Sequence, residues 1–189
     1  MDVNDLKSLN AEARKRMTAA IDHLRHELAG VRTGRASTGI LDPVHVEAYG
    51  TRMPLNQVAT LSVPEPALIV AQPFDPSLMG AIEKAIRASD LGLNPNTDGK
   101  VIRIPVPPLT DERRKELSRH VHKMAEESRN AIRVVRREAN DRLKKLAKDK
   151  KVSEDDEKRG LDEVQKLTDQ FIQQVDELQK KKDAELLSR

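Results

Sequence analysis

Residues 109–151, LTDERRKELSRHVHKMAEESRNAIRVVRREANDRLKKLAKDKK, decide the fold of this chain because they contain neither proline nor glycine. Thr110 is a candidate N-cap, and Asp111 and Glu112 place negative charge on the first helical turn. Apolar side chains then recur every three or four positions, which predicts one long amphipathic helix of roughly 55 Å. They are Leu117, Val121, Met124, Ala131/Ile132, Val135, Ala139, Leu143 and Leu146.

Two further stretches show the same helical spacing. The N-terminal one carries Leu6, Ala13, Met17, Ile21, Leu24 and Leu28, and the one that starts at Ser153 carries Leu161, Val164, Thr168, Phe171, Val175, Leu178 and Leu186. Three apolar stripes can close one core, which predicts an elongated antiparallel three-helix bundle from residues 1–30 and 107–189. An extended homodimeric coiled coil has the same periodicity and stays open as an alternative.

The residues between these helices have a different composition. All ten prolines lie between Pro43 and Pro108, and seven of the eight glycines lie between Gly30 and Gly99. This predicts an inserted small α/β domain over 31–106, and hence an α+β protein with a discontinuous helical domain. We expect strands near 43–49, 61–63, 67–71 and 101–104, a helix after Asp75-Pro76 lined by Leu78, Ile82, Ala85 and Ile86, and a turn over 94–99.

Two connections, near 30–35 and 104–108, join the predicted domains. Glycine permits unusual backbone angles and proline stiffens a segment, so we predict a hinge that allows restricted rotation of the insert. The candidate hinge residues are Gly30, Arg32, Gly34, Arg35, Pro105, Pro107 and Pro108. Arg32 and Arg35 would also place positive charge there, although ordinary linker solubility explains them equally well.

The amino-acid composition and the absence of certain motifs exclude several classes of function. Charged residues make up 34% of the chain, aromatic residues 2%, and there is no cysteine, which excludes disulfides and thiolate chemistry. We see no signal peptide or membrane span and expect a soluble cytoplasmic protein. His23 and His26 are three apart, not the four of the usual zinc-protease motif, and no nucleotide-phosphate loop occurs. We therefore expect no enzyme, no cofactor and no bound metal.

Four arginines, Arg129, Arg133, Arg136 and Arg137, fall on one stripe of the long helix. A row of planar, permanently charged guanidinium groups suits phosphate, and thus RNA. The net charge is only +3, so nucleic-acid contact would have to come from such local clustering. The alternative is a solvated helix flank paired with acids such as Glu126 and Glu138.

Several motifs, in order, resemble the bacterial ribosome recycling factor family over essentially the whole chain. They are Val31-Arg32-Thr33-Gly34-Arg35-Ala36-Ser37, Tyr49-Gly50-Thr51, Pro54-Leu55-Asn56-Gln57, Asp90-Leu91-Gly92-Leu93-Asn94-Pro95, Pro107-Pro108-Leu109-Thr110-Asp111-Glu112-Arg113-Arg114-Lys115, Arg136-Arg137-Glu138-Ala139-Asn140-Asp141, Ser153-Glu154-Asp155-Asp156 and Gln165-Lys166-Leu167-Thr168-Asp169.

The resemblance implies a three-helix bundle with an inserted β/α/β sandwich domain in an L-shaped, tRNA-like outline. It implies a monomeric translation factor that binds the post-termination ribosome and, with elongation factor G and its GTP hydrolysis, promotes subunit dissociation. Arg133 and Arg136 would grip large-subunit rRNA, Arg129 and Arg137 would extend that surface, and neither DNA nor membrane would be a partner. The alternatives are a coiled-coil scaffold and a non-ribosomal RNA-binding protein.

Overall fold

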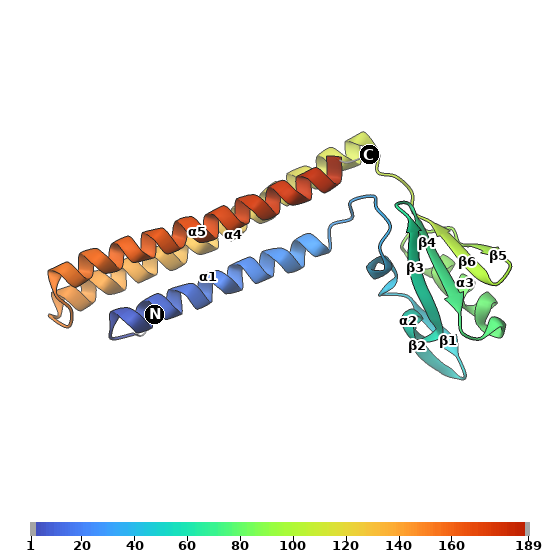
Figure 1. Ribbon diagram of the computed structural model, residues 1–189, viewed down its shortest axis with the longest axis horizontal. Coiled ribbons are helices and arrows are strands. Elements are labelled where there is room, and N and C mark those ends of the chain that lie inside the picture. Colours follow the sequence, from blue (N-terminus) through green and yellow to red (C-terminus); the bar gives the residue numbers. More distant parts are fainter. Residues whose placement is uncertain (1–2, 188–189) are drawn as a thin grey trace. The chain divides into compact units, whose positions relative to one another are not determined.

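The computed structural model describes residues 3–187, and the chain divides into two compact units (Figure 1). The helical unit runs up to Val31 and resumes at Asp111, and the insert unit comprises Arg32–Thr110. The helical unit thus resumes later than the expected residue 107. The reason is local, because Val106 N–H donates to Ala67 O of the insert at 2.8 Å and the next helix begins only at Asp111.

The helical unit consists of α1 (Leu6–Ala29), α4 (Asp111–Lys148) and α5 (Glu154–Leu187), each of which contacts the other two. A short turn reverses the chain between α4 and α5 (Figure 1). α1 is antiparallel to α4, because Ser128 bonds Ala20 while the later Arg142 bonds Asn4 near the chain start. The three apolar stripes close one core within a single chain. An extended homodimeric coiled coil would need a second copy to bury them, and this chain does not.

The buried residues follow the predicted spacing with small differences. Leu6 is only half-buried, and Leu9 takes the corresponding core position in α1. Leu161 and Leu178 are also half-buried, whereas Leu167 is buried. Gly160 lies where three helices approach closely, since a Cβ there would come within 2.8 Å of Leu143 and 3.1 Å of Leu6.

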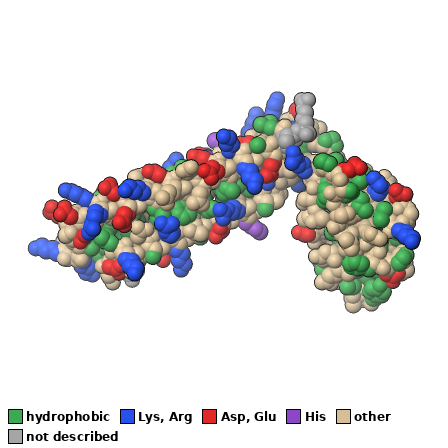
Figure 2. All heavy atoms as spheres, viewed as in Figure 1, with side chains coloured by type: hydrophobic (Ala, Val, Ile, Leu, Met, Phe, Trp, Pro, Cys, Tyr) green, Lys and Arg blue, Asp and Glu red, His purple; other side chains and the backbone are tan. Residues whose placement is uncertain are grey.

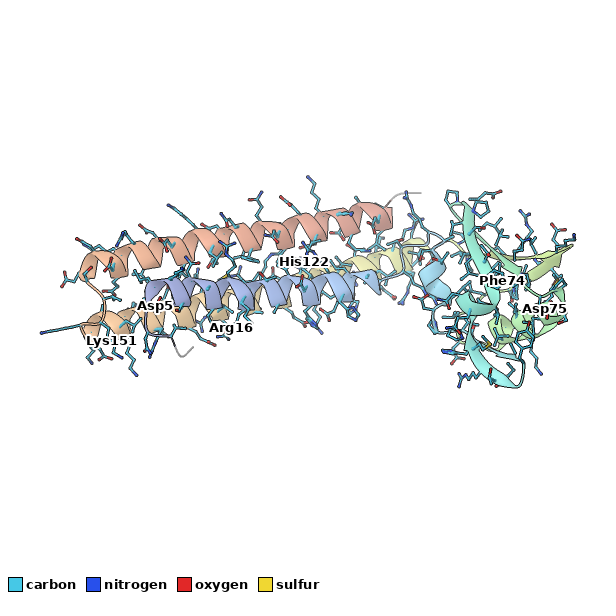
Figure 3. The ribbon with its side chains drawn as sticks, turned by 60° about the horizontal axis from the view of Figure 1, so that its bottom comes forward. Asp5, Arg16, Phe74, Asp75, His122 and Lys151 are labelled. Atoms are coloured by element: carbon cyan, nitrogen blue, oxygen red, sulfur yellow. The ribbon has the colours of Figure 1, made fainter. Side chains whose placement is uncertain are left out.

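Side chains cap the starts of two helices. Asp5 Oδ1 accepts from the Ser8 backbone N–H at 2.9 Å at the start of α1. Ser153 Oγ accepts from the Asp156 N–H at 3.0 Å at the start of α5, the residue at which the sequence pattern begins this helix. Figure 3 shows Asp5 at the same end of the unit as Lys151, which follows α4. These caps satisfy backbone donors that a helix start leaves without partners.

The insert unit contains two antiparallel sheets and a helix. β1 (His45–Ala48) pairs with β2 (Thr51–Pro54), and a second sheet has the order β3-β4-β6-β5 (Figure 1). Its strands are β3 (Ala59–Glu65), β4 (Leu68–Pro73), β5 (Asn96–Asp98) and β6 (Val101–Pro105). α3 (Met79–Ala88) contacts β1 of one sheet and β5 and β6 of the other, so helix and sheets share one core. The α+β class is confirmed.

Three details of the insert differ from the sequence-based expectation. The segment 94–99, expected to be a turn, contains β5, which pairs with β6 through Thr97 and Ile102. β2 and the short helix α2 (Leu55–Val58) were not predicted, because each is only four residues long and has no clear periodicity. The helix after Asp75 begins as a 3₁₀ turn, Pro76–Leu78, before α3 starts at Met79.

Candidate RNA-binding surface

The predicted arginine stripe lies on α4 beside the core-facing side chains. Ile132 and Ala139 are fully buried, which fixes the rotation of the helix about its axis. Arg133 and Arg136 are half-buried next to this core face, and Arg137 is exposed. These three arginines therefore lie on a flank of α4 that solvent and a ligand can reach.

Arg129 differs from the other arginines of the stripe. Its guanidinium donates to Asp176 Oδ1 on α5 from Nε at 2.9 Å and from Nη2 at 2.6 Å, and to Gln179 Oε1 at 2.6 Å. It also pairs with Glu126, and its side chain is only 11% exposed. Burial lowers the pKa of Arg129, but the hydrogen bonds to Asp176 and Glu126 outweigh this and raise it overall. Its donors are thus occupied within the protein.

The remaining three arginines have few partners. Arg133 donates to the Asn130 side chain on the same helix at 3.1 Å. Arg136 and Arg137 have no hydrogen-bond or ion-pair partner within residues 3–187. A guanidinium without a protein partner keeps its fork of N–H donors available for a phosphate oxygen. We name Arg133, Arg136 and Arg137 the arginine surface.

Of the two acids expected to neutralise the stripe, only Glu126 pairs with one of its arginines. Glu126 pairs with Arg129, and Glu138 pairs with Arg16 of α1, where a second hydrogen bond joins Arg16 Nη2 and Glu138 Oε1 at 3.2 Å. The Arg16 hydrogen bonds hold the pKa of Glu138 below its usual range. Neither carboxylate therefore pairs with the arginine surface. Elsewhere on the unit, cations and acids are interspersed on the face shown in Figure 2.

The first predicted hinge segment contains one backbone position that requires glycine. Gly34 has φ +79°, and a Cβ there would come within 3.1 Å of Leu109 Cγ in the other connection. Gly30 caps the end of α1 with an ordinary φ of −76°. Arg32 donates to Leu91 O at 3.3 Å, and Arg35 is exposed without a partner in the described part of the chain.

Both connections are held by the same turn of the insert. Ala36 N–H donates to Pro66 O at 2.7 Å, and Val106 N–H donates to Ala67 O at 2.8 Å. Pro105 is the last residue of β6, and Pro107 and Pro108 follow it as exposed residues before α4. The sequence identified these segments, but not the Gly34–Leu109 contact or the shared anchor, because both join residues distant in sequence.

Residues 3–187 contain neither a candidate metal site nor a candidate membrane-spanning helix. No group of three or more His, Cys, Asp or Glu side chains is arranged to hold a metal ion. None of the described helices combines the length and apolarity needed to cross a membrane.

Comparisons with known proteins agree with the geometry. Residues 24–187 match the family model described as ribosome recycling factor. The ribosome-recycling factor of Carboxydothermus hydrogenoformans is 57% identical, covering 97% of this chain and 99% of the relative. The ribosome-recycling factor of Symbiobacterium thermophilum is 54% identical, and the match covers 96% of this chain and 98% of the relative.

Solved structures give the same family. A solution structure of the ribosome recycling factor has a TM-score of 0.75 at 44% identity and covers 100% of both chains. A second structure has a TM-score of 0.63 at 52% identity and covers 97% of this chain and 99% of the other. It is described as models for the T. thermophilus ribosome recycling factor and the E. coli elongation factor G bound to the E. coli post-termination complex.

Proposed function

Because this chain belongs to the ribosome recycling factor family, we propose that it binds the post-termination ribosome and promotes its dissociation into subunits. Elongation factor G, the partner in the related ribosome-bound structure, would act with it and supply energy by hydrolysing GTP. The chain itself would be a cytoplasmic translation factor rather than a catalyst.

The observation that carries this proposal is the arginine surface. Arg136 and Arg137 lack partners within residues 3–187, and the nearby Glu138 is bound to Arg16. The guanidinium groups would hold rRNA phosphates and position α4 without reading base sequence. Arg129 would act differently from the expectation, because its contacts with Asp176 and Gln179 favour a role in joining α4 to α5.

The two units would have separate roles in this mechanism. The helical unit would be the anchored arm, because it carries the arginine surface, and the insert unit would be the movable one. The connections favour a hinge close to the helices, since the turn at Pro66 and Ala67 holds both connections on the insert side. Movement would then occur between Gly30 and Thr33 and around Thr110, where each connection enters a helix.

Cosedimentation with ribosomes at about 50 mM and about 200 mM salt tests the anchor. Arg136→Gln should weaken binding to the ribosome. It should also reduce the salt slope, the slope of the log binding constant against log salt concentration, by about one unit, because one phosphate contact is lost. Lys145→Gln removes an exposed cation from another face of the same helix and should leave both quantities unchanged. Wild-type affinity and slope for Arg136→Gln would disprove the anchor assignment.

A subunit-splitting assay tests the activity itself. Post-termination ribosomes should separate when this protein, elongation factor G and GTP are all present, and omission of either factor should abolish the effect. Arg136→Gln should require a higher protein concentration for the same splitting rate. Equal splitting without elongation factor G, or binding to RNA but no splitting, would favour a different role such as general RNA binding.

A further inference from the structure

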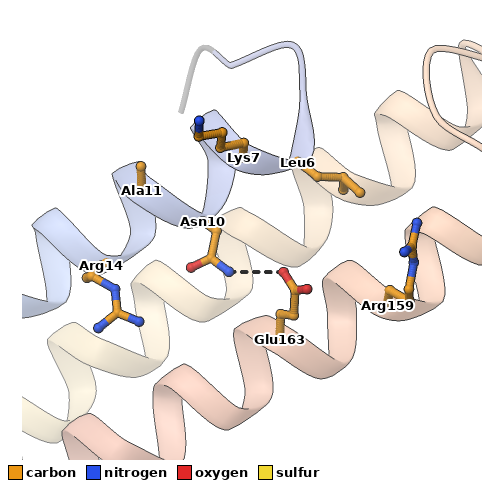
Figure 4. Close-up of a pocket in the computed structure, with 7 residues that line it drawn as sticks. All are labelled: Leu6, Lys7, Asn10, Ala11, Arg14, Arg159 and Glu163. Atoms are coloured by element: carbon orange, nitrogen blue, oxygen red, sulfur yellow. Dashed lines mark hydrogen bonds between the residues drawn. The ribbon is translucent and has the colours of Figure 1, made fainter.

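A groove lies between the first turns of α1 and α5, away from the arginine surface. It has a volume of about 510 Å³ and is lined by Leu6, Lys7, Asn10, Ala11, Arg14, Arg159 and Glu163 (Figure 4). Arginine-surface residues lie on α4, whereas every residue of this groove belongs to α1 or α5. The groove is therefore a separate feature of the helical unit.

The groove has a defined floor. Asn10 Nδ2 donates to Glu163 Oε2 at 3.1 Å, and Figure 4 shows this bond bridging α1 and α5. Leu6 is half-buried beside it, and Ala11 contributes only a methyl group, which leaves room above α1. The floor thus combines apolar surface with an amide and a carboxylate that can exchange hydrogen bonds with a ligand.

The charge of the lining is mainly positive. Lys7, Arg14 and Arg159 are cationic, and only Glu163 is anionic. Lys7 and Arg14 are exposed and have no partner in the described part of the chain, while Arg159 pairs with Asp156. Lys7, Ala11 and Arg14 recur at helical spacing, so the two cations flank the open position above Ala11.

We propose that this groove holds one nucleotide of single-stranded RNA. Lys7 and Arg14 contact its flanking phosphates, its sugar and base edge lie against Leu6 and Ala11, and Glu163 accepts a hydrogen bond from a ribose hydroxyl or a base N–H. A groove of this size fits a ligand larger than a lone phosphate, and the mixed lining matches a nucleotide better than a bare anion. The inference rests on the proposed function, because it takes rRNA as the source of the nucleotide.

The first experiment measures ribosome binding against salt concentration for Arg14→Gln. Loss of one single-strand phosphate contact should reduce the slope of the log binding constant against log salt concentration by about 0.7. The affinity that Arg14→Gln loses relative to wild type should therefore be about fivefold greater at 0.1 M salt than at 1 M salt. Lys15→Gln is the matched control, because Lys15 is an exposed neighbour that does not line the groove. Ala11→Leu fills the groove without changing charge and should also weaken binding.

The outcomes separate this inference from the proposed function. If Arg136→Gln lowers the slope while Arg14→Gln and Ala11→Leu behave like Lys15→Gln, the groove inference is overturned and the anchor on α4 stands. If Arg136→Gln also has no effect, the anchor assignment on α4 fails as well, and the subunit-splitting assay tests the proposed function separately. Thermal unfolding of each variant shows whether the fold is intact.

A photoreactive amino acid at position 11 provides a second readout that does not depend on affinity. Illumination of the ribosome complex should cross-link this position to a small set of rRNA nucleotides. Cross-links to a ribosomal protein alone, or none despite normal binding, would overturn the proposal. The measurement remains informative if one of the charge variants fails to fold.

Discussion

Arg129 on α4 and Asp176 on α5 form an inter-helix pair in which two guanidinium nitrogens share one carboxylate oxygen, at 2.9 and 2.6 Å. Gln179 accepts a third hydrogen bond from the same guanidinium at 2.6 Å. Because the Arg129 side chain is only 11% exposed, these contacts link two helices at a partly desolvated point. Arg129, which the sequence pattern does not distinguish from the other three arginines of the stripe, therefore has a structural role in the fold.

This pair predicts that Arg129→Gln lowers the free energy of unfolding by about 1–2 kcal/mol, since it removes charge-assisted hydrogen bonds. Asp176→Asn should cost less because Asp176 is largely exposed. Urea denaturation of the two single variants and the double variant gives their coupling free energy. Arg137→Gln, which loses no intramolecular contact, should unfold like wild type; equal destabilisation by both arginine variants would contradict the assignment.

The Arg16–Glu138 pair predicts a dependence of stability on pH. Arg16 hydrogen bonds lower the pKa of Glu138 in the folded state. The resulting stability is present above the unfolded pKa of about 4.3 and is lost as pH falls through the lower folded pKa. Urea denaturation from about pH 7 down to about pH 3 should show a smaller acid loss for Glu138→Gln than for wild type.

Asp141→Asn is the matched control for this pH series, because Asp141 is exposed and has no partner in the described residues. It should retain the acid loss that Glu138→Gln lacks. Arg16→Gln should flatten the profile in the same way as Glu138→Gln. Identical profiles for all four proteins would show that the pair contributes nothing to acid sensitivity.

Gly34, which lies in the proposed hinge segment, predicts an effect of backbone conformation on stability. Gly34→Ala places a side chain at φ +79° and brings its Cβ to 3.1 Å from Leu109 Cγ, so it should destabilise the insert by more than the roughly 1 kcal/mol of left-handed backbone strain alone. Gly99→Ala, at φ +62° with no atom within 4 Å, should show only the backbone strain. Equal losses in urea denaturation would exclude a contribution from Leu109.

Substitution of glycine by alanine should have opposite effects on the unfolding temperature at Gly160 and at Gly80. Alanine is favoured over glycine in a helix by about 0.5–1 kcal/mol, so Gly80→Ala, with open space around it in α3, should raise the unfolding temperature. At Gly160 the new Cβ would lie 2.8 Å from Leu143, a buried side chain with little room to move. Gly160→Ala should therefore lower the unfolding temperature, and a rise would show that Leu143 yields easily.

The sequence alone determined the long helices and the position of the insert. A proline-free stretch such as 109–151 restricts local structure, and its apolar period identifies the buried face without reference to distant residues. The start of the last helix at Ser153 could be predicted because its signals are local, and the Asp156 N–H that Ser153 caps is only three residues away. The β5 strand could not, because a three-residue segment becomes a strand only through pairing with β6.

Tertiary structure decided how the arginines differ. Arg129 and Arg136 have equivalent places in a helical period, but only Arg129 has Asp176 and Gln179 within reach, because antiparallel packing brings a segment of α5 beside it. The groove at Asn10 and Glu163 likewise joins residues on two helices that are remote in sequence. Helical periodicity determines the face of the helix on which a side chain lies. The charged groups and cavities that the side chain meets depend on packing between segments distant in sequence, which a local pattern does not encode.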